Sequence, residues 1–323
     1  MKRIPIRNGI KRDFVPARGR ARRAAHINLI RQTMNNKKII TTLVVAIVLL
    51  SALATLSGIL SDSGSGPRMI ESVRGRTVAL YSRGLYRDMS ADVAIQGIAQ
   101  DWITLLFGIP ALLASLYFAR KGSLRGVLAL SGVIGYFLVT YLLYLAMAMY
   151  NRMFLGYVCL VGFSFFALIL CLFSRDFSRL KEFVRDVKLF RTAGYFLMLT
   201  SSLIAILWLS VVLPSLFSGT VPLQVEHYTT LIVQGFDLGL FLPSAFVSGW
   251  LAVRGNRHGY LFTIINVVLL ALLMTALVSK ILFMAAAGQN VVPAVFIIPI
   301  IDLTAIVLSF RLLGSIREDS SST

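Results

Sequence analysis

The chain has 323 residues, of which 57% are hydrophobic and 14% are charged, and its formal net charge is +18. Soluble domains carry about 25% charged residues, so this composition excludes a soluble domain. The charge does not indicate nucleic-acid binding, because twelve of the 32 lysines and arginines precede Ile39 and most others lie in short turns between apolar blocks. The composition predicts a polytopic membrane protein in contact with a lipid bilayer.

The N-terminal segment, residues 1–38, is basic and has too few apolar residues to form a core. We therefore expect a disordered cytoplasmic tail that touches anionic lipid head groups. The first membrane span is expected at Ile39–Leu60. Two alternatives stay open here: translation starts at Met34, or residues 34–54 act as a cleaved signal peptide. The length of the apolar run favours an uncleaved helix.

The outer loop, residues 61–98, is the largest polar segment between two apolar blocks. It has many Gly and Ser residues, and its segment Arg76–Tyr86 predicts two short strands around Ser82–Gly84. Ser90 is expected to cap an amphipathic helix that leads into the second span. This loop is the outer segment large enough to form a small structured cap.

Seven further apolar segments have the length of a membrane span. They are expected at Asp101–Ala119, Val127–Met149, Phe154–Phe173, Ala193–Leu213, Leu231–Val253, Tyr260–Met284 and Val291–Leu313. The fold class predicted is an all-α transmembrane bundle of eight spans. Residues 39–174 form a first half and residues 192–314 a second half. Residues 175–191 join them, either as an amphipathic helix at the membrane surface or as an ordinary linker.

An even number of spans places both termini, including the short tail 315–323, on one side of the membrane. The two tails and the turns after the second, fourth and sixth spans hold 25 of the 32 basic residues. Basic residues concentrate in cytoplasmic segments. We therefore expect the protein in the inner membrane, with both termini in the cytoplasm.

Two segments suggest an internal repeat. Asp101–Gly126 and Asp237–Gly259 each begin with an acid, contain a proline and end in a basic turn with glycine. This pattern predicts a parallel arrangement of four plus four helices. The match has a gap, because the proline follows the acid by nine residues in the first segment and by six in the second. The competing interpretation is that all spans running toward the cytoplasm end in Arg or Lys and therefore look similar.

Three acids lie within or near the apolar segments, where a charge at the helix centre costs about 2.5–3.5 kcal/mol or more. Asp302 lies about 16 Å into its span and must face protein or water. Asp101 is interpreted first as a helix cap at the outer surface, and Asp237 lies deeper. Lys280 near the outer boundary either reaches the head groups or pairs with Asp101 or Asp237.

The same three helices contain Pro110, Pro243 and Pro299. A proline frees the carbonyl four residues earlier, and such carbonyls beside acids can coordinate a cation or simply mark a packing kink. The third span places the hydroxyls of Tyr136, Thr140 and Tyr144 on one face. They are predicted to line an aqueous vestibule, and the alternative is aromatic packing.

Several kinds of chemistry have no support in the sequence. The three histidines belong to different segments, so we expect no metal site. Cys159 and Cys171 lie about 18 Å apart along one helix, too far for a disulfide. No catalytic or cofactor-binding motif is present, so enzymatic function and a cofactor are not favoured. The pair Gly235 and Gly239 forms a GxxxG pattern that predicts close helix packing.

The runs DWITLLFGIPALLASLYFARKGSLRG, GYFLVTYLLYLAMAMYNRMFLGYVCLVGFSFFALI, ALYSRGLYRDMS and FDLGLFLPSAFVSGWLAVRG resemble a family of prokaryotic multi-pass membrane proteins of unknown function. The resemblance covers roughly residues 37–315. It implies a fold and a membrane location, and it assigns no functional residue.

Two functions are compatible with these patterns. The first is a small-molecule or ion transporter with an outward-opening polar cavity formed around the embedded acids. The second is a non-enzymatic assembly or signalling module that acts through loop 61–98 and linker 175–191, as a homo-oligomer or with a membrane partner.

Overall fold

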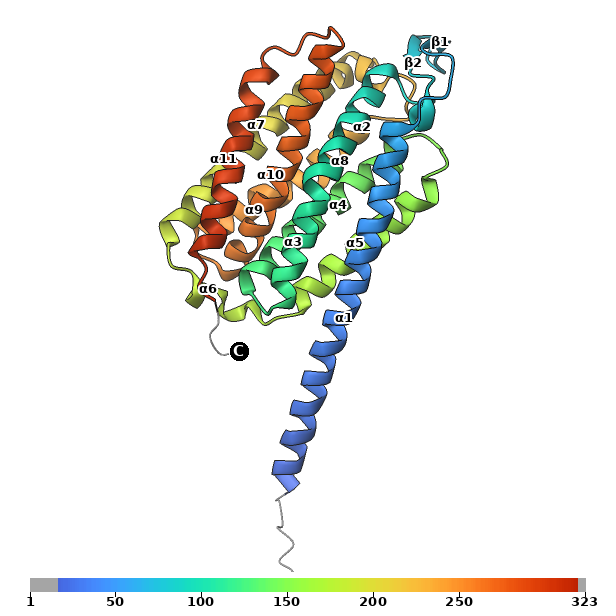
Figure 1. Ribbon diagram of the computed structural model, residues 1–323. Helices are drawn as coiled ribbons and strands as arrows, with labels where there is room; N and C mark the ends of the chain where they lie inside the picture. Colours follow the sequence, from blue (N-terminus) through green and yellow to red (C-terminus); the bar gives the residue numbers. More distant parts are fainter. Residues whose placement is uncertain (1–16, 319–323) are drawn as a thin grey trace, which may run out of the picture.

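Eight apolar helical segments run side by side through residues 17–318, the part of the chain that the computed structural model describes (Figure 1). Each is long and apolar enough to cross a membrane. The predicted all-α bundle of eight spans is therefore confirmed, and the chain is a multi-pass membrane protein. The start of α1 and the end of the described chain lie at the same end of the bundle (Figure 1).

The helices occupy the following residues. They are α1 (Ala17–Leu60), α2 (Ala91–Ile103), α3 (Ile109–Arg120), α4 (Leu124–Met147), α5 (Phe154–Phe173), α6 (Leu180–Phe183), α7 (Val187–Ser218), α8 (Ile232–Phe236), α9 (Leu242–Val253), α10 (Arg257–Ala286) and α11 (Ala294–Ser315). The pairs α2–α3 and α8–α9 each form one span. The short α6 lies in the connection between the halves.

The basic N-terminal segment differs from the expectation. We expect disorder over residues 1–38, whereas α1 continues back to Ala17 and projects beyond the bundle (Figure 1). Alanine and arginine are among the strongest helix formers, and a helix already nucleated by the span extends through them at low cost. Residues 1–16 lie outside the described part of the chain.

The connection over residues 175–191 is not one helix lying on a membrane surface. It contains the single turn α6 and then Val184, which forms a β-bridge with Ile316. The Asp186 side chain accepts a hydrogen bond from the backbone N–H of Leu189, so α7 begins within the expected linker. The C-terminal segment therefore holds this connection by backbone pairing.

Two helix boundaries also differ. The fifth span is expected to stop at Pro214, but α7 includes this proline and ends at Ser218, before Gly219 in the left-handed conformation with φ 66°. Membrane helices tolerate proline because neighbouring groups satisfy the freed carbonyl. The second span starts at Ala91, ten residues before Asp101.

The outer loop forms a hairpin in which one strand lies in the expected segment Arg76–Tyr86, while its partner strand precedes this segment. Strands β1 (Arg68–Glu71) and β2 (Thr77–Leu80) pair antiparallel. The chain turns at Gly75, which has φ 72°, and not around Ser82–Gly84. Gly84 instead lies against the backbone carbonyl of Ser61, where a Cβ would overlap it. This close approach fixes the base of the loop on the end of α1.

Arginines of this hairpin join it to the outer loop of the second half. Arg74 donates from Nη1 to the carbonyl of Tyr228 (2.9 Å) and from Nη2 to that of Thr229 (3.0 Å). Arg76 donates to the carbonyl of Val221 (3.0 Å). The two halves are thus connected at the hairpin end by bonds from side chains to main-chain oxygens.

A second contact between the outer loops involves Tyr228, whose hydroxyl accepts from the backbone N–H of Ser90 (3.3 Å). Burial raises the pKa of Tyr228 to about 12. Ser90 precedes the first residue of α2, so this hydroxyl satisfies an N–H at the start of the second span.

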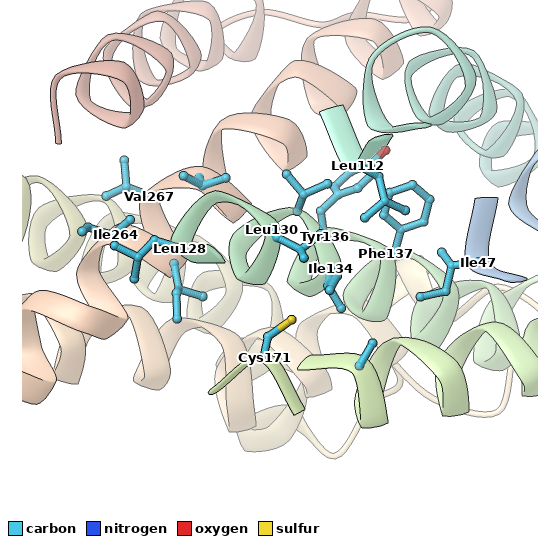
Figure 2. Packing of buried hydrophobic residues seen from close by; sticks show 14 of the residues in the cluster. Ile47, Leu112, Leu128, Leu130, Ile134, Tyr136, Phe137, Cys171, Ile264 and Val267 are labelled. Atoms are coloured by element: carbon cyan, nitrogen blue, oxygen red, sulfur yellow. The ribbon is translucent and has the colours of Figure 1, made fainter. Parts of the chain in front are cut away.

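Helix α4 forms the centre of the bundle. Most of its apolar span is buried, and it packs against α3, α5 and α10. Figure 2 shows its Leu128 near Ile264 and Val267 of α10. Gly132 and Gly135 bring the two helices close, because a Cβ at Gly132 would lie 2.6 Å from Val268. The seam between α4 and α10 is therefore the main contact between the halves.

Two of the three expected proline kinks coincide with an irregular turn. A π-helical turn at Thr104–Gly108 precedes Pro110, and another at Asp237–Phe241 precedes Pro243. A π turn inserts one residue into the helix, which relieves the clash between a proline ring and the preceding turn. Pro299 lies inside α11, which is assigned as continuous α-helix.

The segments after these prolines have the same local geometry at a constant spacing of 133 residues. Lys121 stacks over the ring of Tyr117 at 4.4 Å, and Arg254 over the ring of Trp250 at 4.1 Å. The next residues, Gly122 and Gly255, have φ 87° and 70°. In both halves the following residue then caps the next helix with its side chain.

The register has no gap. Gly126 and Gly259 each lie against the backbone of the preceding span, beside Ala119 and Ala252 respectively. The same spacing of 133 residues relates the two π turns. At this spacing Asp237 lies opposite Thr104 in the sequence, and the match that pairs Asp237 with Asp101 does not follow it.

Candidate binding site between the two halves

A pocket of about 130 Å³ lies between α2, α4 and α10, with one residue from α8. It lies toward the end of the bundle that carries the hairpin, because its wall includes the start of α2 and the end of α4 (Figure 1). Its polar lining residues are Gln96, Gln100, Thr140, Tyr144 and Lys280, and its apolar ones include Val93, Leu143, Met147, Val233 and Leu273.

Residues from both sequence halves line the pocket. Three pairs of lining residues are 133 positions apart, namely Gln100 and Val233, Thr140 and Leu273, and Met147 and Lys280. The pocket is therefore lined in part by pairs of residues at this constant spacing. Its lining is asymmetric, because each pair combines one polar and one apolar side chain.

The amide of Gln100 is held by a buried network. Its Nε2 donates to Tyr136 Oη (2.9 Å) and to Thr140 Oγ1 (3.3 Å). Thr104 Oγ1 lies 2.7 Å from Tyr136 Oη. The tyrosine is fully buried behind the pocket and does not line it. The network fixes the orientation of Gln100. Its Oε1 is left to accept a hydrogen bond from a ligand.

Asp101 is buried and does not cap a helix. Its carboxylate accepts from Tyr86 Oη (2.6 Å) and Tyr144 Oη (2.9 Å). Tyr144 Oη also lies 2.7 Å from the carbonyl of Gly97. Gly58 of α1 approaches so closely that a Cβ there would overlap Asp101 Oδ2. Since the N–H groups free at a helix start belong to its first turn, an acid ten residues inside the helix cannot cap it.

Lys280 lines the pocket and lies within electrostatic range of Asp237 and Asp101. Among residues 36–318, no carboxylate forms an ion pair with it within 4.0 Å. The expected pairing with either acid is therefore an interaction at longer range. The side chain contributes a cation to the pocket wall.

Asp237 is anchored to a different helix. Its Oδ2 accepts from Trp208 Nε1 of α7 at 2.7 Å. At the flanking Gly235 and Gly239, a Cβ would meet no atom within 4 Å. The close packing expected from this GxxxG pattern thus does not occur within the described chain, because Gly235 of α8 and Gly239 of the following π turn are both exposed.

Asp302 does not line the pocket. It is buried between α10 and α11, where Thr275 Oγ1 donates to its Oδ1 at 3.0 Å. The structure therefore brings Tyr144, Thr140 and Asp101 together with Lys280 around one site. Asp237 lies within electrostatic range of Lys280, and Asp302 is bound elsewhere, by Thr275.

Three important residues of this site are absent from the sequence-based predictions. Gln96 and Gln100 form the polar face of α2, and Tyr86 binds Asp101 from the preceding loop. The available signal for the glutamines was their spacing of four on the amphipathic helix expected after Ser90, because both precede the expected second span. Tyr86 has no such signal, since its position depends on how the loop folds back.

The lining chemistry limits what the site can do. It offers one cation, two amides, two hydroxyls and an apolar wall. Within the described residues, no cluster of three His, Cys, Asp or Glu side chains is suited to a metal ion. Such a lining is typical of a site that binds a small molecule and orients it by a few polar groups.

In comparisons with known proteins, the chain matches no family model, no curated protein sequence and no solved structure. The resemblance to a prokaryotic membrane-protein family thus stays a prediction.

Proposed function

We propose that the protein is a membrane transporter that binds a small molecule between two repeated halves of four helices each. The pocket lined by corresponding positions of both halves supports this proposal. In transporters built from repeats, substrate sites lie at the repeat interface, and one repeat moves against the other. The constant spacing of 133 residues supports the repeat.

The irregular helices support movement around the pocket. The spans α2–α3 and α8–α9 each change from α to π geometry before a proline. Such interruptions are common at functional sites in helices and are points of bending. A bend in α2–α3 repositions Gln100 relative to Thr104, and so alters the pocket wall.

The orientation follows from the basic residues. The turns at Lys121 and Arg254 lie at the end of the bundle opposite the hairpin. Because basic residues concentrate in the cytoplasm, the hairpin end faces outward across an inner membrane and both termini face the cytoplasm. The pocket is then entered from outside.

Cysteine accessibility tests this arrangement. In a background with Cys159→Ala and Cys171→Ala, Gln96→Cys is expected to react in right-side-out vesicles with a membrane-impermeant thiol reagent. Val73→Cys at the exposed hairpin is the positive control, and Leu203→Cys on the exposed apolar face of α7 is the negative control. Lack of reaction at Gln96→Cys, with the expected result at both controls, would contradict a water-accessible site.

Transport itself is tested by the small-molecule content of cells that produce the protein. The wild-type chain is expected to change the level of at least one metabolite, and Gln100→Leu is expected to abolish that change at equal protein amount in the membrane. Ser210→Ala, exposed on α7, is the matched control. Identical profiles for cells with and without the protein would count against transport.

A second function, assembly with a partner through loop 61–98, is favoured by one observation. Met69 and Val73 of the hairpin are 65% and 94% exposed. A partner that co-purifies with the wild type and with Gln100→Leu, but not with a Met69→Ser/Val73→Ser double variant, would support this function. Linker 175–191 exposes less apolar surface to a partner, because its Leu180 is buried in the core.

A further inference from the structure

The pocket contains a cation whose hydrogen-bonding positions are not filled by the protein. Lys280 lines the pocket and is half-buried. Within residues 36–318 it makes no hydrogen bond and no ion pair within 4.0 Å. An ammonium group has three donors, and leaving them unmet inside an apolar span is costly. The acceptors for this ammonium group therefore come from water or a ligand in the pocket.

The nearest acids do not supply that acceptor. The Asp101 carboxylate accepts hydrogen bonds from Tyr86 and Tyr144. The Asp237 carboxylate accepts one from Trp208 Nε1. They stabilise the ammonium group by charge over a distance. Lys280 lines the pocket, so its donors are available to a ligand there.

The rest of the wall defines the ligand further. Gln96 is half-buried and lines the pocket, and Gln100 is oriented by its network. Leu143 and Leu273 provide an apolar surface. The volume of about 130 Å³ is below the roughly 300–1,000 Å³ of sites for drug-sized ligands, so the pocket suits a small ligand.

We propose that Lys280 binds the anionic group of a small organic ligand, a carboxylate or phosphate, while the amides of Gln96 and Gln100 bind its polar atoms. The ligand's short apolar part packs on the leucines. This inference rests on the proposed function, since it names the class of substrate that the same pocket takes.

Two thiol reagents of similar size and opposite charge test the inference. They are methanethiosulfonates that carry a sulfonate or a quaternary ammonium group, and they are applied to Gln96→Cys in the cysteine-free background. Rates are divided by those at Val73→Cys to remove intrinsic reactivity. We expect the sulfonate reagent to react faster at Gln96→Cys, because the cation concentrates anions in the pocket.

Charge variants separate Lys280 from other causes. Lys280→Met is expected to lower the rate ratio of sulfonate to ammonium reagent roughly tenfold, as for removal of one unit charge near a partly buried site. Lys280→Arg keeps the charge and is expected to keep the preference. Arg152→Gln removes an exposed cation in the turn between α4 and α5 and is expected to change nothing.

The outcomes distinguish the two proposals. Equal rates, or a faster ammonium reagent, overturn the anion site while leaving a water-accessible pocket in place. No reaction with either reagent at Gln96→Cys removes the proposed function and the anion site together. If both reagents react more slowly at Gln96→Cys, relative to Val73→Cys, in phosphatidylglycerol nanodiscs than in phosphatidylcholine nanodiscs, the occupant is a lipid head group and the small ligand is overturned; surface charge alone would slow only the sulfonate reagent. An equal elution profile for each variant confirms folding.

Discussion

The contact between α1 and the buried carboxylate leads to a specific prediction for Gly58→Ala. The added Cβ would overlap Asp101 Oδ2 and lie 2.6 Å from Tyr86 Oη and 3.0 Å from Tyr86 Cε2. All three groups are buried, so none can move into solvent. Either the helices separate or the carboxylate loses its hydrogen bond with the tyrosine.

The expected cost follows from these two responses. Overpacking a well-packed interior costs about 1–3 kcal/mol, and losing a hydrogen bond to a charged group costs about 1.5–3 kcal/mol. Because one response partly relieves the other, we expect a destabilisation of about 3 kcal/mol for Gly58→Ala. Gly162→Ala on α5 is the matched control, since no atom lies within 4 Å of its Cβ position. Alanine there is expected to stabilise the helix by roughly 0.5–1 kcal/mol.

The assay is equilibrium unfolding in mixed micelles of a mild detergent and dodecyl sulfate, followed by circular dichroism. The midpoint for Gly58→Ala should shift to lower dodecyl sulfate, and the midpoint for Gly162→Ala should stay or rise. If Gly58→Ala unfolds at the same midpoint as Gly162→Ala, then α1 does not approach Asp101 closely and the geometry of this carboxylate is wrong.

Three further predictions concern other contacts. Gly126→Ala and Gly259→Ala should each destabilise the protein by about 2 kcal/mol in the same unfolding assay, and a difference above about 1 kcal/mol would contradict the equivalent geometry. Thr275→Val removes the donor to Asp302 and should cost about 1.5–3 kcal/mol, while Thr275→Ser, which keeps a hydroxyl, should cost less than half as much. Burial raises the pKa of Tyr228 to about 12, so the neutral phenol is favoured in the folded state and its contribution is complete below about pH 10. That contribution should be lost between about pH 10 and 12 in melting experiments, and Tyr228→Phe should show a weaker loss over this range.

The spans were predictable because membrane length and hydropathy determine them almost alone. The bounds of α5 are the predicted Phe154–Phe173, and α1 ends at the predicted Leu60. Predictions fail where a local rule depends on a context that the sequence does not display. The rule that proline ends a helix predicts a stop at Pro214, whereas α7 continues through this residue inside a membrane span.

The candidate site was predictable only in part. Tyr136, Thr140 and Tyr144 share one face of α4, which follows from helical spacing, and all three take part in hydrogen bonds with α2. The role of Asp101 was not predictable, because one of its donors comes from a loop whose fold has no periodic signal. The position of Asp101 inside the helix was not predictable either, since α2 begins in a polar segment that hydropathy excludes from the span.

The arginine contacts at the hairpin end have a consequence for sequence variation among relatives of this protein. Arg74 and Arg76 bind the main-chain oxygens of Val221, Tyr228 and Thr229. Every residue type provides such an oxygen, so the accepting loop can change most of its side chains and still hold the joint. The donors have no such freedom, because lysine lacks the planar fork of arginine. When sequences of relatives are aligned, the two arginines should persist while residues 219–231 diverge around them.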